Sequence, residues 1–504
     1  ADEDKEPCHS AGHWLIEIEA AQKEVEKWHK QGDKIVERFI DDRKGRDGNY
    51  RLNLFTANVQ TLRAMLYGNT PKVEVTRRYA DANDDVARVS AEMLERILNT
   101  DIEESGEGYD EALMNGLSDL LLSGLGVARV RYEAEFEKTI TEAIIGEDDV
   151  VLADEVVEET KTYEEACVDY VYWKDFLWSP ARTWSDVRWV AFKAEMTKEE
   201  VCKRFGDVSK RLQYKKSAAT NEADSNEDPW AKATIWEIWD KSSKSVFWWS
   251  KGCDELLDTK EDPLELKGFF PCPKPMFANL TTSKLLPTPE YIIAQDQYIE
   301  IDVLTTRITM LQKAVKAVGV YDKSSDGVQR MLIEGVDNQL IPVDNWAMFA
   351  EKGGLQGSVV WMPLADIVNA MDKLRDYRNE VKQLLYEVTG MSDIMRGAQT
   401  MGQATATEQL LKSRFGSVRV QQIQNRFVEF ATDLQRLRAE VICNHFDDQT
   451  IVASSNMMYS HDQQLIPPAL NLLREDFVAY RINIESEQMA QIDRAQMNNE
   501  RMEY

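Results

Sequence analysis

Residues able to do acid–base or metal chemistry are few and scattered in this chain of 504 residues. There are five histidines, and only His9 and His13 stand at the i, i+4 spacing that places two ligands on one helix face. With the neighbouring Cys8 they could hold a metal ion if this segment is helical. The alternative is a polar chain end with no metal.

Acidic pairs are the second group with chemical potential. Asp41-Asp42, Asp84-Asp85 and Asp148-Asp149 have the residue types of a two-metal nuclease. They stand in polar runs without a matching Lys or His, which argues against catalysis. The chain also lacks G-x-x-x-x-G-K-[ST], H-E-x-x-H, and a G-x-G-x-x-G at a strand-to-helix turn. We therefore predict no enzymatic activity, no cofactor and no bound metal.

The charge balance is strongly acidic. Lys and Arg number 60 against 88 Asp and Glu, a formal net charge of −28. General attraction to a nucleic-acid backbone is thereby opposed, because phosphates are repelled. The charge could serve solubility alone, or it could belong to a surface that DNA slides past without adhering. Six scattered cysteines indicate a reducing compartment, and no apolar run is long enough for a membrane span.

Three long helical patterns dominate the second half of the chain, at 290–317, 364–389 and 405–446. In the first of them, apolar residues recur at steps of three and four, which indicates one buried helix face. The members of that stripe are Tyr298, Ile301, Leu304, Ile308, Leu311, Val315 and Val318. Residues 318–363 separate the first two patterns and contain short strand-like runs, so a small αβ tip between two rods is predicted.

The first half of the chain alternates helical and strand patterns. Helices are predicted at 13–41, 50–67, 84–125 and, after a capping box at Thr197 and Glu200, in one short segment. Strands are predicted at 73–76, 127–132, 170–196, 234–240, 245–249 and, near the end, 477–485. An acidic exposed hairpin is expected between 133 and 170, and a polar mobile loop at 215–229. The thirteen Trp residues are assigned mainly to sheet core or subunit contacts, with base stacking as the alternative.

One run is specific enough to indicate a family. Residues 387–416 read EVTGMSDIMRGAQTMGQATATEQLLKSRFG, and this run resembles the signature of portal proteins from short-tailed, double-stranded DNA bacteriophages. The segment Asp169–Phe192, with Trp178-Ser179-Pro180, is similar to the wing of that family, although it is weak by itself. The similarity extends from about residue 53 to 440. A further C-terminal crown or barrel, common in the family, is not evident before Tyr504.

The resemblance implies an α+β, mainly α fold with four kinds of region. It assigns 1–289 to the wing, 290–317 and 364–390 to the two stem helices, 318–363 to the clip, and 391–404 to a kink or tunnel loop at the channel. It assigns 405–446 to a long helix between wing and crown, and 447–504 to a return strand and the start of the crown.

The same resemblance implies the function and the partners. Twelve subunits would form a ring at one capsid vertex, through which double-stranded DNA is packaged and later ejected. Partners would be the terminase large subunit, capsid and scaffolding proteins, and tail adaptors, with the protein located in the virion and no membrane involved. The packaging force would come from a separate motor.

Candidate contact residues can be named within this framework. For the DNA channel they are Arg396, Gln399, Gln403 and Lys412, with Arg414 and Arg419 as further basic residues nearby. Solvated or salt-bridged helix charges are the alternative interpretation of the basic ones. For terminase or adaptor contact the candidates are Lys323, Arg330 and Trp346. Two other functions stay open, a metal-dependent DNA-processing enzyme and a non-viral helical scaffold or adaptor.

Overall fold

The computed structural model describes most of the chain. The described residues are 10–42, 49–68, 70–77, 84–104, 107–141, 144–145, 151–153, 156–215, 230–315, 319–321, 347, 351, 359–361, 364–391, 406–475 and 480–484. The structure is mixed α and β with helix as the larger part, which confirms the predicted class at that level. None of the described helices combines the length and apolar character needed to cross a bilayer.

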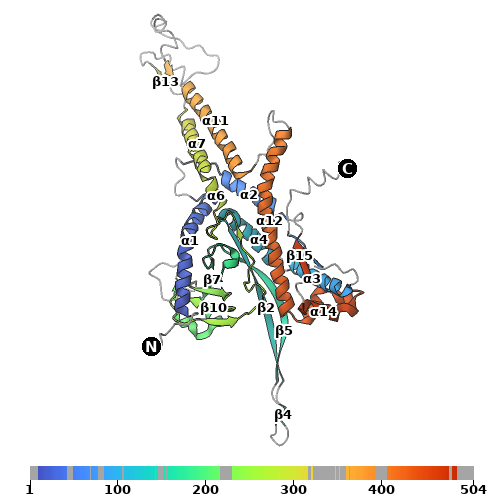
Figure 1. Cartoon of the computed structure of the whole chain (residues 1–504). Helices are drawn as coiled ribbons and strands as arrows, with labels where there is room; N and C mark the ends of the chain where they lie inside the picture. The colour runs from blue at the N-terminus through green and yellow to red at the C-terminus, as the bar shows by residue number, and fades with distance from the viewer. Residues whose placement is uncertain are drawn as a thin grey trace. The chain divides into compact units, whose positions relative to one another are not determined.

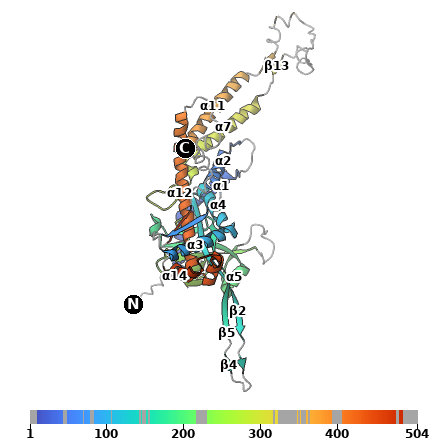
Figure 2. The same cartoon turned by 90° about the vertical axis from the view of Figure 1, so that its right-hand side faces the viewer.

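The chain divides into two compact units. The first unit contains Ala1–Ile40, Thr56–Ile292 and Gly402–Tyr504, and the second contains Asp41–Phe55 and Ile293–Met401. Figures 1 and 2 show the elements of both units in two views. Because the chain passes between the units more than once, each unit is assembled from segments that are distant in sequence.

Most helices of the first unit agree with the sequence prediction, but those at 448–455 and 466–475 fall where only a return strand and the start of a crown were predicted. The pattern predicted at 84–125 is two helices, α3 (Asp85–Glu104) and α4 (Glu107–Leu122), rather than one. The other helices are α1 (Ala11–Phe39), α2 (Leu54–Leu66, which begins in the second unit), α5 (Lys198–Phe205), α6 (Glu290–Ile293), α12 (Ala406–His445), α13 (Asp448–Ser455) and α14 (Ile466–Glu475). The capping box predicted at Thr197 and Glu200 is present at the start of α5.

The main sheet of the first unit is antiparallel and has six strands. Its order is β11-β10-β9-β7-β6, and β8 pairs with β9 beside that path. The strands are β6 (Phe176–Trp178), β7 (Trp189–Thr197), β8 (Tyr214–Lys215), β9 (Lys232–Asp240), β10 (Ser245–Ser250) and β11 (Asp258–Glu261). A separate pair joins β1 (Val73–Arg77) to β15 (Tyr480–Ile484), close to the strand predicted near the C-terminus.

A second sheet extends into a long ribbon. Strands β2 (Leu125–Thr141) and β5 (Val156–Val171) pair from Val127↔Val171 to Thr141↔Val156, so the hairpin is longer than predicted. Strand β12 (Met276–Phe277) adds two residues at the base, and β3 (Ile144–Ile145) pairs with β4 (Val151–Ala153) near the tip. Figures 1 and 2 show β2 and β5 leaving the rest of the first unit as a narrow two-stranded ribbon.

Tryptophans form much of the first unit's core, partly in places the sequence did not indicate. Trp173, Trp178 and Trp189 are buried in strands or the turns between them, as predicted. Trp14 and Trp28, however, lie on helix α1 and are 1% and 2% exposed. The Trp28 ring lies 5.2 Å from that of Trp173, and its Nε1 donates to the Ser123 carbonyl at 2.8 Å. Burial of each such ring contributes about 1.5–3 kcal/mol, which fixes α1 on the strands.

The second unit is built on two helices. Helix α7 (Gln295–Ala314) covers most of the predicted 290–317 pattern, after a break at Ala294, and α11 (Leu364–Thr389) matches the second pattern. Between them, β13 (Gly319–Tyr321) pairs with β14 (Val359–Trp361), which agrees with the run predicted at 358–361. The other predicted strands of the tip, at 331–333 and 340–343, lie outside the described residues, as does the predicted loop at 216–229.

Replacement of Gly32 by Ala should destabilise the first unit. A Cβ at this position would lie 2.5 Å from the Trp173 ring, so α1 would have to move from the strands. We expect a loss of about 1–3 kcal/mol, although Ala is ordinarily the better helix residue. Thermal unfolding measures it. Gly268→Ala is the control, because nothing lies within 4 Å of its added Cβ. An equal melting temperature for Gly32→Ala and the parent would contradict the packing described.

Candidate functional site

The predicted contact residues are mostly outside the described part of the chain. This applies to Arg396, Gln399 and Gln403 of the predicted channel, and to Lys323, Arg330 and Trp346 of the predicted terminase surface. Lys412 and Arg414 belong to α12, but their side chains are not described, whereas Arg419 is exposed on that helix. The candidate site is therefore argued from the elements on either side of these residues: α7, α11 and α12.

Helix α7 is apolar on two opposite sides. Tyr298, Ile301, Leu304 and Ile308 form its buried face. Ile299, Val303 and Met310 are 53%, 38% and 50% exposed. Their spacing of four and seven residues places them on one line along the helix, opposite the buried face. We call these three residues the outer stripe.

Helix α11 also exposes apolar side chains. Tyr377 and Leu384, seven residues apart and so on one face, are 47% and 53% exposed. Met371, Val381 and Leu385 are buried on another face of the same helix. A helix that is apolar on more than one side normally has a neighbour on each of them. The exposed apolar faces of α7 and α11 therefore indicate that this helix pair packs against further partners.

A short extended segment holds one flank of α7. The backbone N–H of Tyr50 donates to Thr306 Oγ1 at 3.0 Å, and the same hydroxyl donates to the Tyr50 carbonyl at 3.0 Å. The N–H of Leu52 donates to Asp302 Oδ1 at 3.2 Å, and Phe55 packs edge-on against Tyr298 at 5.5 Å. Residues 50–55 thus cover polar positions of α7 and leave the outer stripe uncovered.

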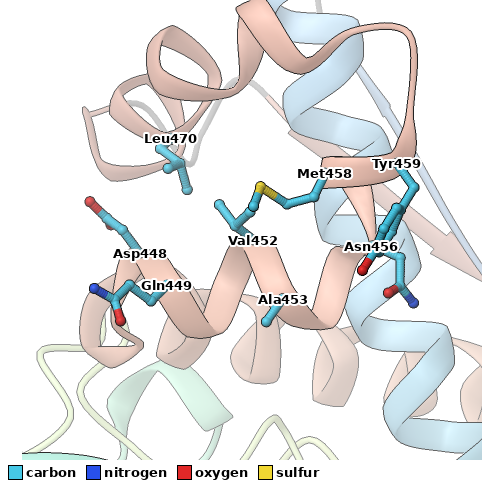
Figure 3. Close-up of a pocket in the computed structure, with 8 residues that line it drawn as sticks. All are labelled: Asp448, Gln449, Val452, Ala453, Asn456, Met458, Tyr459 and Leu470. Atoms are coloured by element: carbon cyan, nitrogen blue, oxygen red, sulfur yellow. The ribbon is translucent and has the colours of Figure 1, made fainter.

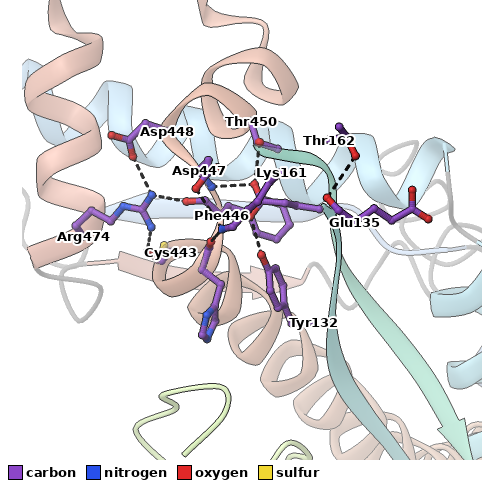
Figure 4. Close-up of polar contacts among 12 residues, drawn as sticks. Tyr132, Glu135, Lys161, Thr162, Cys443, Phe446, Asp447, Asp448, Thr450 and Arg474 are labelled. Atoms are coloured by element: carbon purple, nitrogen blue, oxygen red, sulfur yellow. Dashed lines mark hydrogen bonds and ion pairs between the residues drawn. The ribbon is translucent and has the colours of Figure 1, made fainter. Parts of the chain in front are cut away.

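In the first unit, two cations cap the C-terminal end of α12. Lys161 Nζ from β5 donates to the His445 carbonyl at 2.9 Å, and Arg474 from α14 donates to the carbonyls of Cys443 and Phe446. Figure 4 shows Lys161 and Arg474 at this end of the helix, with Cys443 and Phe446 beside Arg474. The last carbonyls of a helix lack partners within the helix, and the negative end of its dipole favours cations. The two side chains therefore stabilise the end of a 40-residue helix.

A buried carboxylate completes this anchor. Glu164, on β5, accepts hydrogen bonds from the Asp447 N–H at 2.9 Å, Thr450 Oγ1 at 2.8 Å, Lys161 Nζ at 2.9 Å and Tyr132 Oη at 2.7 Å. The first two donors belong to the N-terminal turn of α13, where a negative charge is favourable. Burial raises the pKa of Glu164, but these hydrogen bonds outweigh it and hold the pKa below the ordinary value. We call Lys161, Glu164 and Arg474 the α12 anchor.

Beside the anchor lies a mainly apolar pocket of about 520 Å³ (Figure 3). Val452, Ala453 and Leu470 line it, while Met458 and Tyr459, 57% and 91% exposed, stand at its edge. Asp448, also in the lining, pairs with Arg474 at 2.8 Å. The pocket has no nucleophile–base pair, and its chemistry is that of apolar contact.

The described residues give no support to the predicted metal or nuclease candidates. Among them, no group of three or more His, Cys, Asp or Glu could hold a metal ion. His13 lies on α1 with its ring 5.2 Å from that of Trp14, whereas Cys8, His9 and the Asp148-Asp149 pair lie outside the described positions.

Two comparisons with known proteins found no match. No protein-family model matches it, and no curated protein matches it.

Sequence reasoning missed the α12 anchor entirely. Lys161 and Glu164 were assigned only to an exposed acidic hairpin, and Arg474 was not singled out. The partners are some 280 residues apart in the chain, so no local pattern connects them. The one local indication was the predicted end of a long helix, because the last carbonyls of a helix have no hydrogen-bond donor within it.

Replacement of Glu164 by Gln should loosen the α12 anchor. The amide retains one acceptor oxygen and loses the charge shared by four donors, so we expect a loss of about 2–3 kcal/mol. Hydrogen exchange at residues 440–450 and the melting temperature both report it. Glu133→Gln, a half-exposed carboxylate on the same ribbon, is the control.

The effect should depend on pH in a defined direction. Because the folded-state pKa of Glu164 is lowered, its contribution is present above the unfolded value of about 4.3 and is lost as the pH falls through the folded-state value. The difference between Glu164→Gln and the parent should therefore be largest at neutral pH and shrink in acid. A difference independent of pH would contradict an ionised Glu164.

Proposed function

We propose that this chain is the subunit of a phage portal, a ring through which double-stranded DNA enters and leaves the capsid. The observation that carries the proposal is the outer stripe of α7 together with the exposed Tyr377 and Leu384 of α11. In a single copy of the chain, the apolar residues on the outward faces of this helix pair remain exposed to water. Copies arranged by rotation would cover these faces with one another, and a head-to-tail contact that closes gives a ring.

Two sequence features support the choice of a portal over other rings. The run at 387–416 resembles the portal signature and directly connects α11 to α12. The net charge of −28 suits a conduit that must not retain DNA along its whole length. In this proposal the second unit contributes stem and clip, and most of the first unit is the wing. Residues 391–404, which include Arg396, Gln399 and Gln403, face the channel together with Lys412 of α12.

The proposed partners follow from the same assignment. Lys323, Arg330 and Trp346, in the clip, would meet the terminase and later the tail adaptors, while the wing would face capsid and scaffolding proteins. The subunit would do no chemistry itself, and the motor would be a separate ATPase. No described feature favours a DNA-processing enzyme or a non-viral scaffold over this function.

Charges placed on the outer stripe should prevent assembly. In Ile299→Asp with Val303→Asp, two carboxylates would have to be buried against the neighbouring copy, at a cost of several kcal/mol per interface. Sedimentation velocity should show a large complex for the parent and free subunits for the variant.

The control is Gln312→Asp, which adds one of the two negative charges to α7 at an exposed position outside the stripe. Circular dichroism verifies that each variant is folded. If the doubly substituted protein assembled like the parent, the outer stripe would not be an interface and the proposal would lose its main support.

A further inference from the structure

A short segment between β11 and β12 contains backbone strain. Glu265 and Phe269 have positive φ angles of 49° and 66°, in the left-handed region. That region brings Cβ close to the following carbonyl oxygen, so it is costly for residues other than glycine, and a bulky residue such as Phe adopts it rarely. Gly268 stands between them, but its φ is not positive. The local sequence therefore does not relieve the strain, and contacts from elsewhere must maintain it.

Helix α12 supplies two of these contacts. We call residues 265–268 the strap. Glu440 Oε1 accepts a hydrogen bond from the Lys267 N–H at 2.6 Å, and Asn444 Nδ2 donates to the Glu265 carbonyl at 2.9 Å. Glu440 and Asn444 are four residues apart and lie on one face of α12. The helix therefore holds the backbone of the strap at two points from a single face.

The chain on both sides of the strap is fixed in the sheets. Before it, Glu261 ends β11, which is paired with β10. After it, Phe269 is 2% exposed and its ring lies 5.5 Å from that of Trp239 on β9. The Pro271 carbonyl accepts a hydrogen bond from the Val130 N–H of β2 at 2.7 Å. The strap can therefore change conformation while the residues around it keep their places.

Opposing contributions act on the strap. The burial of Leu266, which is 4% exposed, and the two hydrogen bonds from α12 favour the observed conformation. The positive φ angles of Glu265 and Phe269, at its two ends, oppose it. Glu265, Lys267 and Gly268 are exposed, so their movement would uncover little apolar surface. Loss of the contacts with α12 would therefore allow the strap to relax.

We propose that the strap is a conformational switch that responds to the position of the last turns of α12. With the helix in place, Glu440 and Asn444 keep the strap in its strained conformation. When this end of α12 shifts, both contacts break together, Glu265 returns to a negative φ, and Leu266 leaves its buried position. A displacement of the helix is thereby converted into a new surface between the two sheets. The switch lies within the first unit and does not depend on ring formation.

Two glycine substitutions separate strain from ordinary flexibility. Glu265→Gly removes the cost of the positive φ, so hydrogen exchange of peptides covering 262–271 should slow about threefold or more. Lys267→Gly places the same residue where φ is not positive, so exchange should become faster. Both rates are measured by mass spectrometry and corrected for intrinsic exchange. If both substitutions accelerated exchange, the strap would be an ordinary loop and the inference would be wrong.

Removal of the two α12 side chains tests what holds the strap. Glu440→Ala with Asn444→Ala should raise exchange at 262–271 about tenfold or more, because both hydrogen bonds are lost. Gln421→Ala with Asn425→Ala is the matched control, with the same spacing at exposed positions of the same helix. Circular dichroism verifies that each variant is folded. Exchange equal to that of the parent would show that α12 does not hold the strap.

The response to α12 itself is tested through the α12 anchor. Glu164→Gln loosens the end of the helix just beyond Asn444, so exchange at 262–271 should rise severalfold. In a chain that already has Glu440→Ala and Asn444→Ala, the same change should add nothing, whereas additive effects would contradict a shared switch. A failure of these results leaves the portal proposal standing. A parent that never assembles would contradict the portal proposal alone, because the strap is measured within one copy.

Discussion

The apolar residues on opposite sides of α7 are the constraint on which the functional account depends. Ile301, Leu304 and Ile308 are covered within the second unit, whereas Ile299, Val303 and Met310 are not. Residues 50–55 could have covered the outer stripe, but they bind to polar positions of the helix instead. Removing the outer stripe from water would be favourable. In the proposed ring, a neighbouring copy would cover it.

In the first unit, the main structural constraint is the position of α12, a helix of 40 residues. Its end is fixed by Lys161 and Arg474, which donate to the final carbonyls, and by Glu164, which accepts from the Asp447 N–H and the Thr450 hydroxyl of the segment that follows. Two of these three side chains belong to β5 of the β2–β5 ribbon, opposite Ala134 and Phe136. Ribbon and long helix are thereby joined through part-buried, charge-assisted hydrogen bonds, so a displacement of one would strain the other.

Local patterns in the sequence were sufficient to predict most helices and strands, but they did not predict the contact surfaces. The periodicity of 290–317, the capping box at Thr197 and the alternation at 245–249 depend on neighbours within a few residues, and each corresponds to an observed element. The break at Ala294 and the division of 84–125 into α3 and α4 were not foreseen, because tertiary packing decides where a helical pattern is interrupted. Trp28 was recognised as an apolar position of the first helix but Trp14 was not, and neither of their partners, Trp173 and Trp189, was foreseen, since both are distant in sequence.

The contact surfaces were harder to predict for a related reason. Ile299, Val303 and Met310 have the same residue types as the buried face of α7, so the sequence could not separate inner from outer apolar residues.

The most direct test of the account is an image of the purified full-length protein. Negative-stain electron microscopy should show annular particles with an axial hole and rotational symmetry, as expected if α7 and α11 are covered by neighbouring copies. Compact single subunits at all concentrations, or small oligomers without a hole, would contradict it.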